Sequence, residues 1–344
     1  MSAIKTIGIV SLSSGILGED SLTHQRELGV KRLEAYGIKV KFMTNTLKGL
    51  KYLHGHPEAR AADFLEAFQD PELDLIMTAI GGDDTYRLLP WLFGHDELKN
   101  ALTRKRFLGF SDTTVNHLML HKLGLPSFYG QAFLCELCEP APEMLPYSRR
   151  CFEEFIETGR VSEVRPSPLW YESRPDWGPE QFGVYPPVHE NRGFELLQGP
   201  PVFRGRILGG CIDTLYDLFD GERYADSPSL CAEYGLFPPA EDWRGRILLL
   251  ESSEEKPSPE KYRRGLLYLK EAGVLEAVSG LLIGKPMDEA YDAEYRAILQ
   301  EVVDDPAKPI LCNIPVGHAM PRCILPFGIE AEVDAENQVI RFFD

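Results

Sequence analysis

A serine follows directly after an apolar stretch in the segment Leu108-Gly-Phe-Ser111-Asp-Thr-Thr114. The residues before it predict a strand and those after it a helix, so Ser111 falls at a strand-to-helix turn. Such a turn exposes the hydroxyl, and the free N–H groups at the helix start can stabilise an oxyanion. This is typical of a nucleophile, although Thr113 stands where a nucleophile elbow has its second glycine. Taken alone, these residues fit helix capping by Ser111 or Asp112 better.

Paired glycines end a second apolar stretch, in Ala79-Ile-Gly81-Gly82-Asp-Asp-Thr85. Glycine lets the backbone approach a ligand closely and presents N–H donors to an anion. Because parallel strands end at the same edge of a sheet, we expect Gly82 to lie near Ser111. The amides of Gly82 and Asp112 are then candidates for an oxyanion hole. A tight turn capped by one of the aspartates is the alternative.

A serine nucleophile needs a base, and the base needs a group that orients it. Of the eight histidines, His318 is the best candidate because it follows an apolar stretch in a loop bounded by proline and glycine. Glu251 ends another apolar stretch, where we expect a half-buried carboxylate with a defined partner. Loop packing of the histidine and an ion pair of the glutamate are the alternatives. Glu254 and Glu255 are predicted to be ordinary solvated charges.

Two further patterns have the spacing of metal ligands but lack companions. Cys135-x-x-Cys138 is not followed by a second ligand pair, and His117-x-x-x-His121 lacks the glutamate of a zinc-binding helix. We therefore predict structural roles for the cysteines, a helix surface for the histidines and no metal. The chain has neither a G-x-G-x-x-G motif nor a P-loop, so no nucleotide cofactor is predicted.

Strand-like and helical stretches alternate up to about residue 165. Strands are predicted over 6–10, 38–43, 73–80, 106–110 and 126–129, and helices over 22–36, 58–69 and 112–123. This alternation predicts an α/β fold with a mainly parallel sheet, covered on both faces, and with ligand chemistry at the carboxyl ends of its strands.

The composition changes over residues 166–201, which hold eight of the 26 prolines together with several aromatic residues. Proline at this density resists helix and central strand, so an ordered connecting loop is predicted. Its aromatic residues suit a functional loop and a merely anchored one equally. Strands over 246–251, 280–283 and 310–312, helices over 259–272 and 293–303, and a hairpin over 329–333 and 338–342 follow. We therefore predict two α/β domains, 1–165 and 201–344, joined by the loop 166–200.

The chain carries 36 Lys and Arg against 53 Asp and Glu, a net charge of −17. This field repels nucleic acid and anionic membranes, so the expected partners are small molecules. No apolar run approaches the ~20 residues that span a bilayer. The N-terminal residues lack the features of a secretion signal, and the seven cysteines are scattered and odd in number, as in a reduced cytoplasmic protein.

Taken together, these motifs resemble the LD-carboxypeptidase family of serine peptidases in order and spacing, over nearly the whole chain. The segments that carry the resemblance are Gly81-Gly82-Asp83-Asp84, Gly109-Phe-Ser111-Asp112, Gly209-Gly210, Leu250-Glu251 and Val316-Gly-His318. The tryptophan-bearing segment 169–177 and the residues around Glu251 are similar to its MccF-like subgroup of microcin C self-immunity proteins. The resemblance implies a Rossmann-like N-terminal domain, a C-terminal α/β domain with a mixed sheet, a site in the cleft between them, a homodimer, and neither metal nor cofactor.

The resemblance also implies a role for each site residue. Ser111 is the nucleophile, His318 the general base and Glu251 the group that orients it. The amides of Gly82 and Asp112 form the oxyanion hole. The residues expected to bind substrate are Gly81, Asp83, Trp170, Trp177 and Cys211.

The substrate is less closely defined than these roles. The MccF-like subgroup implies hydrolysis of an amide between a C-terminal aspartyl group and a nucleotide-like moiety, with Trp170 or Trp177 stacking on the heterocycle. Cleavage of murein tetrapeptides in cell-wall recycling is the alternative, and a non-catalytic two-domain binding protein is the alternative of another class. Cys211 replaces an asparagine frequent in the family and lacks its amide hydrogen bonds, which favours a different substrate.

Overall fold

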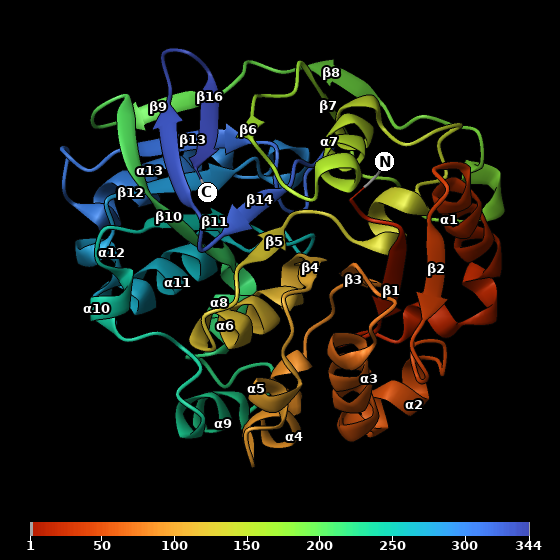
Figure 1. The fold of residues 1–344 in the computed structure, drawn as a ribbon. Helices are drawn as coiled ribbons and strands as arrows, with labels where there is room; N and C mark the ends of the chain where they lie inside the picture. The colour runs from red at the N-terminus through yellow and green to blue at the C-terminus, as the bar shows by residue number, and fades with distance from the viewer. Residues whose placement is uncertain (1–2, 344) are drawn as a thin grey trace.

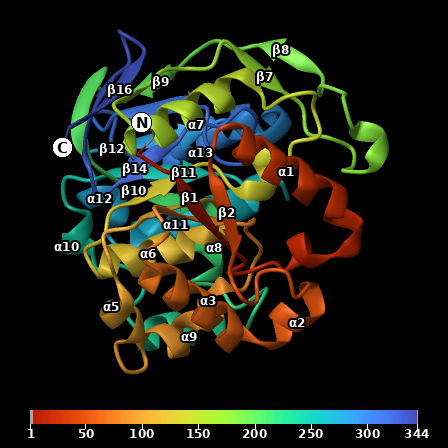
Figure 2. The same cartoon turned by 45° about the vertical axis from the view of Figure 1, so that its right-hand side comes forward.

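The computed structural model describes residues 3–343 and arranges them as two β-sheets with helices packed around them (Figure 1). Residues 1, 2 and 344, at the outer ends of the two predicted domains, lie outside the described residues. The first half of the chain, red to yellow in Figure 1, lies beside the second half, green to blue; Figure 2 shows the same arrangement turned by 45°. Within residues 3–343, no helix is long and apolar enough to cross a membrane.

The first sheet has the strand order β14-β5-β4-β3-β1-β2. Five of these strands are parallel to their neighbours, and β14 runs antiparallel to β5. The strands are β1 (Thr6–Val10), β2 (Lys39–Phe42), β3 (Leu75–Thr78), β4 (Arg106–Gly109), β5 (Ser127–Tyr129) and β14 (Leu325–Phe327). The predicted mainly parallel sheet is therefore confirmed.

Helices cover both faces of this sheet because its strands bury side chains on alternate sides. Leu75 and Met77 of β3 pack in one apolar cluster with residues of α1 (Thr23–Ala35) and α7 (Pro146–Thr158). Ile76 between them belongs to the other cluster, with residues of α3 (Pro57–Gln69) and α6 (Thr114–Lys122). The remaining helices of this half are α2 (Leu50–Gly55), α4 (Leu89–Phe93) and α5 (Glu97–Ala101).

The second sheet is mixed, with the order β6-β16-β15-β10-β11-β12-β13-β9. Its four central strands, β10 to β13, are parallel, and the flanking strands are antiparallel. The strands are β6 (Glu163–Val164), β9 (Glu195–Gln198), β10 (Val202–Cys211), β11 (Ile247–Glu251), β12 (Gly280–Gly284), β13 (Ile310–Ile314), β15 (Glu330–Asp334) and β16 (Val339–Phe343). Its helices are α8 (Ile212–Asp217), α9 (Ser227–Glu233), α10 (Ala240–Trp243), α11 (Pro259–Glu271), α12 (Val274–Ala277) and α13 (Asp292–Val303). The mixed second sheet is thus confirmed as well.

The proline-rich segment is more regular than a plain loop. It contains a two-stranded ribbon of β7 (Leu169–Tyr171) and β8 (Val188–Glu190), and then β9 at the edge of the second sheet. Edge positions tolerate the missing N–H groups of neighbouring prolines, which explains strands in a segment that excludes central ones. The division into domains at residues 165 and 201 stays a prediction.

Candidate active site

The turn after β4 presents Ser111 in a strained conformation. Ser111 begins a 3₁₀ turn that leads into α6, and its φ of +66° lies in the left-handed region. This region costs a non-glycine residue about 1–2 kcal/mol. Two hydrogen bonds stabilise it: the backbone N–H of Ser111 donates to the Tyr129 hydroxyl (3.1 Å), and its carbonyl accepts from the Thr114 hydroxyl (2.7 Å). The Asp112 carboxylate accepts from the Thr85 backbone N–H instead of capping α6.

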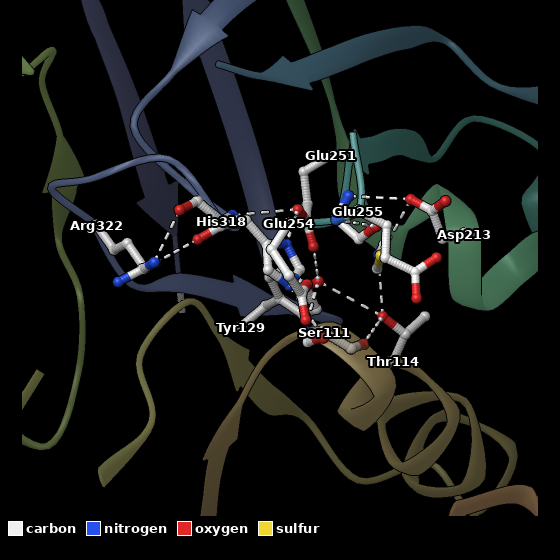
Figure 3. Close-up of polar contacts among 12 residues, drawn as sticks. Ser111, Thr114, Tyr129, Asp213, Glu251, Glu254, Glu255, His318 and Arg322 are labelled. Carbon is white, nitrogen blue, oxygen red and sulfur yellow. Dashed lines mark hydrogen bonds and ion pairs between the residues drawn. The ribbon is translucent and has the colours of Figure 1, made fainter. Parts of the chain in front are cut away.

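The structure brings Ser111, His318 and Glu251 together in one line of contacts (Figure 3). His318 Nε2 lies 3.0 Å from Ser111 Oγ, and His318 Nδ1 lies 2.7 Å from Glu251 Oε2. The side chain of Glu251 is fully buried and that of His318 is 8% exposed. Ser111 follows β4 of the first sheet, whereas Glu251 ends β11 of the second, so the contact forms where the two sheets meet.

The loop that carries His318 is fixed from behind by Arg322. This buried guanidinium bonds the backbone carbonyls of Gly317 and His318 and forms an ion pair with Glu136 (2.7 Å). Gly317 has a φ of +90°, and a side chain there would overlap the carboxylate of Glu251. Glycine is therefore required at this position for the histidine and the glutamate to meet.

Tyr129 joins Ser111 to the Glu251 carboxylate, a contact that the sequence analysis missed. Its hydroxyl donates to Glu251 Oε1 (2.6 Å) and accepts from the Ser111 backbone (3.1 Å). Burial and the neighbouring carboxylate raise the pKa of Tyr129 well above its ordinary value, so the hydroxyl keeps the proton that it donates. Tyr129 ends a predicted strand next to that of Ser111, so the strand-end rule that found Ser111 also pointed to it.

Of the paired glycines, Gly81 lies directly against the serine turn, and Gly82 lines a small hollow that also reaches Ser111. A side chain on Gly81 would stand 2.8 Å from Ser111 Oγ and 3.2 Å from the Asp112 nitrogen. Gly82 has a φ of +150°. Ser13 holds the loop in place, because its Oγ accepts from the backbone N–H groups of Asp83 (3.0 Å) and Asp84 (3.3 Å).

Glu254 corrects one prediction of the sequence analysis. Its side chain is 64% exposed, yet its Oε2 lies 3.0 Å from His318 Nε2, the nitrogen that faces Ser111. Burial alone would lower the pKa of His318, but the charges and hydrogen bonds of Glu251 and Glu254 raise it to about 10. The bond to His318 lowers the pKa of Glu254 to about 2. Glu254 is therefore part of the site rather than a solvated charge.

A hollow of about 310 Å³ opens beside this cluster, and a smaller one reaches Ser111 and Cys211. Both are lined by carboxylates and by a single arginine, Arg223. Arg223 contacts Asp217 (3.1 Å), Glu255 (2.7 Å) and Asp83 (3.4 Å). These contacts, the bond to Glu255 foremost, raise its pKa. The predicted substrate residues Asp83 and Cys211 lie at the hollows, as does Gly82, the candidate oxyanion donor, whereas Gly81 lines neither hollow. Arg223 had no signal in the sequence.

The two candidate tryptophans line neither of these hollows. Trp170 is 9% exposed, stacks on His189 with ring centres 4.4 Å apart, and lies 4.7 Å from Lys285 Nζ. Trp177 is 39% exposed. Of these two tryptophans, Trp177 is therefore the more exposed.

Two sequence motifs outside the site are placed as well. His117 is fully buried, not on a helix surface as predicted, and its ring contacts Ser127 Oγ (2.7 Å) and the Gly109 carbonyl (3.1 Å). Burial lowers its pKa to about 4. All seven cysteines are free thiols. A hydroxyl, an imidazole and a carboxylate that contact one another in this order are the arrangement by which serine hydrolases work.

Comparison with known proteins defines the class further. Models of the LD-carboxypeptidase N-terminal and C-terminal domains match residues 7–130 and 204–333. The crystal structure of an MccF-like protein from Streptococcus pneumoniae, in complex with AMP, is 55% identical, covers 99% of both chains and has a TM-score of 0.97. The chain therefore belongs to the LD-carboxypeptidase family and is a serine hydrolase. The predicted resemblance is confirmed, and the alternative of a non-catalytic binding protein is wrong.

More distant relatives include a microcin self-immunity protein and a murein tetrapeptide carboxypeptidase. The microcin C7 self-immunity protein MccF of Escherichia coli is 27% identical over 91% of this chain and 86% of that protein. A structure of MccF in complex with aspartyl sulfamoyl adenosine has the same fold, with a TM-score of 0.79 at 24% identity over 99% of this chain and 96% of that one. The murein tetrapeptide carboxypeptidase of Pseudomonas aeruginosa is 30% identical, but over only 30% of this chain and 33% of that protein.

Proposed function

We propose that Ser111, His318 and Glu251 form a catalytic triad that hydrolyses an amide bond. The observation that carries this proposal is the unbroken chain of contacts from Ser111 Oγ through the imidazole to the buried carboxylate of Glu251. Such a chain lets the imidazole accept the serine proton while the carboxylate holds the ring and stabilises its positive charge.

In the proposed reaction, Ser111 Oγ attacks the carbonyl carbon and its proton passes to His318 Nε2. The oxyanion accepts hydrogen bonds from the backbone amides of Gly82 and Asp112. The imidazolium then protonates the leaving nitrogen, the C–N bond breaks, and an ester on Ser111 remains. Water attacks this ester with His318 again as the base, which releases the acid and restores the serine.

The substrate we propose has an aspartyl group joined through an amide to a nucleotide-like moiety. Two observations on relatives support it: the similar S. pneumoniae protein was solved with AMP, and MccF with aspartyl sulfamoyl adenosine. In this chain Arg223 is the cation at the hollow for an aspartyl carboxylate, and Trp177 has an exposed indole for a base. We further propose that the enzyme acts as a cytoplasmic homodimer without metal or cofactor.

Hydrolysis of a murein tetrapeptide is the second candidate. The partial match to the P. aeruginosa enzyme supports it. The replacement of the family asparagine by Cys211 leaves the substrate of this chain open to differ from that of MccF. Burial raises the pKa of Cys211, so this position offers a neutral thiol in place of an amide.

A parallel hydrolysis assay tests both candidates. Purified enzyme is given an aspartyl-adenylate analogue with a nitrogen-linked aspartyl group, or a murein tetrapeptide, and the released products are quantified. We expect cleavage of the nucleotidyl substrate and a loss of about 10⁶-fold in kcat for Ser111→Ala. Ser162→Ala, at an exposed serine, is the matched control and keeps full activity. Undiminished turnover by Ser111→Ala would refute the triad. Cleavage of the tetrapeptide alone would show that the murein tetrapeptide, and not the nucleotidyl compound, is the substrate.

A further inference from the structure

The Glu254 carboxylate lies next to His318 Nε2, the nitrogen that exchanges the proton in the proposed reaction. Its Oε2 and Ser111 Oγ both lie 3.0 Å from His318 Nε2, so a carboxylate and the nucleophile share one ring nitrogen (Figure 3). The other ring nitrogen is held by Glu251 at 2.7 Å. The imidazole therefore lies between two carboxylates.

This arrangement favours the protonated ring. In the imidazolium, both nitrogens carry a proton and each faces a carboxylate, which makes two charge-assisted hydrogen bonds. In the neutral ring, with its proton on Nδ1 toward Glu251, the lone pair of Nε2 faces the negative oxygen of Glu254 without a proton between them. With Glu254 in place, the form that can accept the proton of Ser111 is thus the unfavourable one.

The position of Glu254 is also that of the leaving group. The leaving nitrogen must come within hydrogen-bond distance of His318 Nε2 to receive its proton. In the free enzyme the Glu254 carboxylate occupies hydrogen-bond distance from that same nitrogen. Because the Glu254 side chain is 64% exposed and follows the end of β11 by three residues, it can turn outward without disturbing buried contacts.

We propose that Glu254 is a positioning residue that keeps the proton on His318 in the free enzyme and is displaced by the leaving group of the substrate. Displacement removes one of the two carboxylates, so the ring loses its proton more readily and becomes a base only when a substrate is bound. The serine is thereby kept unreactive toward adventitious acyl compounds. The inference rests on the proposed triad.

Other charged and titratable groups around His318 do not have this relation to Nε2. Glu251 on β11 binds Nδ1, Arg322 binds the backbone carbonyl of His318, and the buried thiol of Cys211 lies near the ring. Phe110, before the serine turn, packs its ring edge-on against the imidazole. Among the residues of 3–343, Glu254 is the one carboxylate found within ion-pair distance of Nε2.

The test is the protonation of His318 in Glu254→Gln, with Glu255→Gln as the matched control. Both variants remove one negative charge from adjacent positions, but Glu255 contacts Arg223 and not the histidine. Nuclear magnetic resonance of the imidazole nitrogens follows the titration in the free enzyme. A fluorophosphonate probe measures the reactivity of Ser111 across the same pH range.

We expect the His318 midpoint to move to lower pH in Glu254→Gln and to move less in Glu255→Gln. The base is active when neutral, so labelling at pH 7 accelerates, by about tenfold for each pH unit that the midpoint falls. An unchanged midpoint in Glu254→Gln, or equal shifts in both variants, would overturn the proposal. Absence of labelling at Ser111 in every variant would instead refute the triad, since the titration of His318 needs neither substrate nor turnover.

Discussion

Tyr129 is the residue on which the geometry of the site depends most, apart from the three residues of the proposed triad. One hydroxyl serves both the strained turn of Ser111 and the second oxygen of the Glu251 carboxylate. The carboxylate oxygen is fully buried, so water cannot replace this donor. Tyr129 thereby links the conformation of Ser111 to the position of the Glu251 carboxylate.

We therefore expect Tyr129→Phe to lower both stability and kcat. Removing the hydroxyl leaves a buried carboxylate oxygen and a backbone N–H without their partner, at a cost of about 1–3 kcal/mol. Thermal unfolding measures the loss of stability, and steady-state kinetics on the cleaved substrate measure kcat and KM separately. The loss belongs mainly in kcat, because the hydroxyl supports the reacting groups and does not line the hollow.

Tyr36→Phe is the control for this experiment. It removes a hydroxyl that also donates to a glutamate, Glu153 (2.9 Å), at the end of α1 and away from the site. It is expected to leave kcat unchanged. A Tyr129→Phe enzyme with the kcat of the wild type would show that the hydroxyl does not position the triad.

The site residues at the ends of strands could be predicted from the sequence. Glu254 and Arg223, which lie on irregular segments, could not. Ser111, Glu251 and Gly82 each follow an apolar stretch, and the carboxyl edge of a sheet gathers such positions whatever the remaining sequence is. Glu254 and Arg223 lie on irregular segments, where the direction of a side chain depends on tertiary contacts that leave no periodic pattern. Glu254 was misjudged for this reason: exposure and charge were evident, but not its contact with a buried ring.

At the scale of elements, the segment 166–201 is a strap fixed to both halves of the molecule. Arg174, whose side chain is 1% exposed, pairs with Glu139 of the first half. Ser173 bonds Asp288 of the second half through its backbone N–H (2.7 Å) and its hydroxyl (2.6 Å). The sequence left anchoring and function equally open for the aromatic residues, and these contacts assign Trp170 to anchoring while leaving Trp177 exposed.

The two tryptophans should therefore respond differently to alanine. Trp170→Ala removes a packed indole and is expected to destabilise the fold by about 3 kcal/mol. Trp177→Ala is expected to leave stability unchanged and to raise KM for the nucleotidyl substrate. The rise corresponds to the binding free energy of one base–aromatic stacking contact, about 1–3 kcal/mol. Denaturant unfolding and KM measurements on both substrates distinguish the variants. An equal KM for the nucleotidyl substrate in Trp177→Ala and wild type would rule out stacking by this residue.

At the scale of the whole molecule, the two halves exchange strands. β14 comes from the second half but completes the first sheet beside β5, and β6 from the first half pairs with β16. One continuous apolar cluster includes Ile76 and Phe107 of the first sheet together with Leu248 and Ile310 of the second. The order of strands along the chain predicted each sheet, but it could not predict this exchange, because a three-residue strand such as β14 carries no periodicity of its own.

This exchange predicts that the two proposed domains unfold together. Removing either half would expose a sheet edge and part of the shared apolar cluster, so neither half has a complete core alone. Trp91 in α4 and Trp243 in α10 provide one fluorescent reporter in each half. In each variant that keeps only one of the four tryptophans, we expect the urea midpoint followed by fluorescence to equal the midpoint followed by circular dichroism on the same variant. A separate cooperative transition of the fragment 1–165, or two distinct midpoints in the full chain, would show instead that the halves are independent and that the triad forms by docking of two prefolded domains.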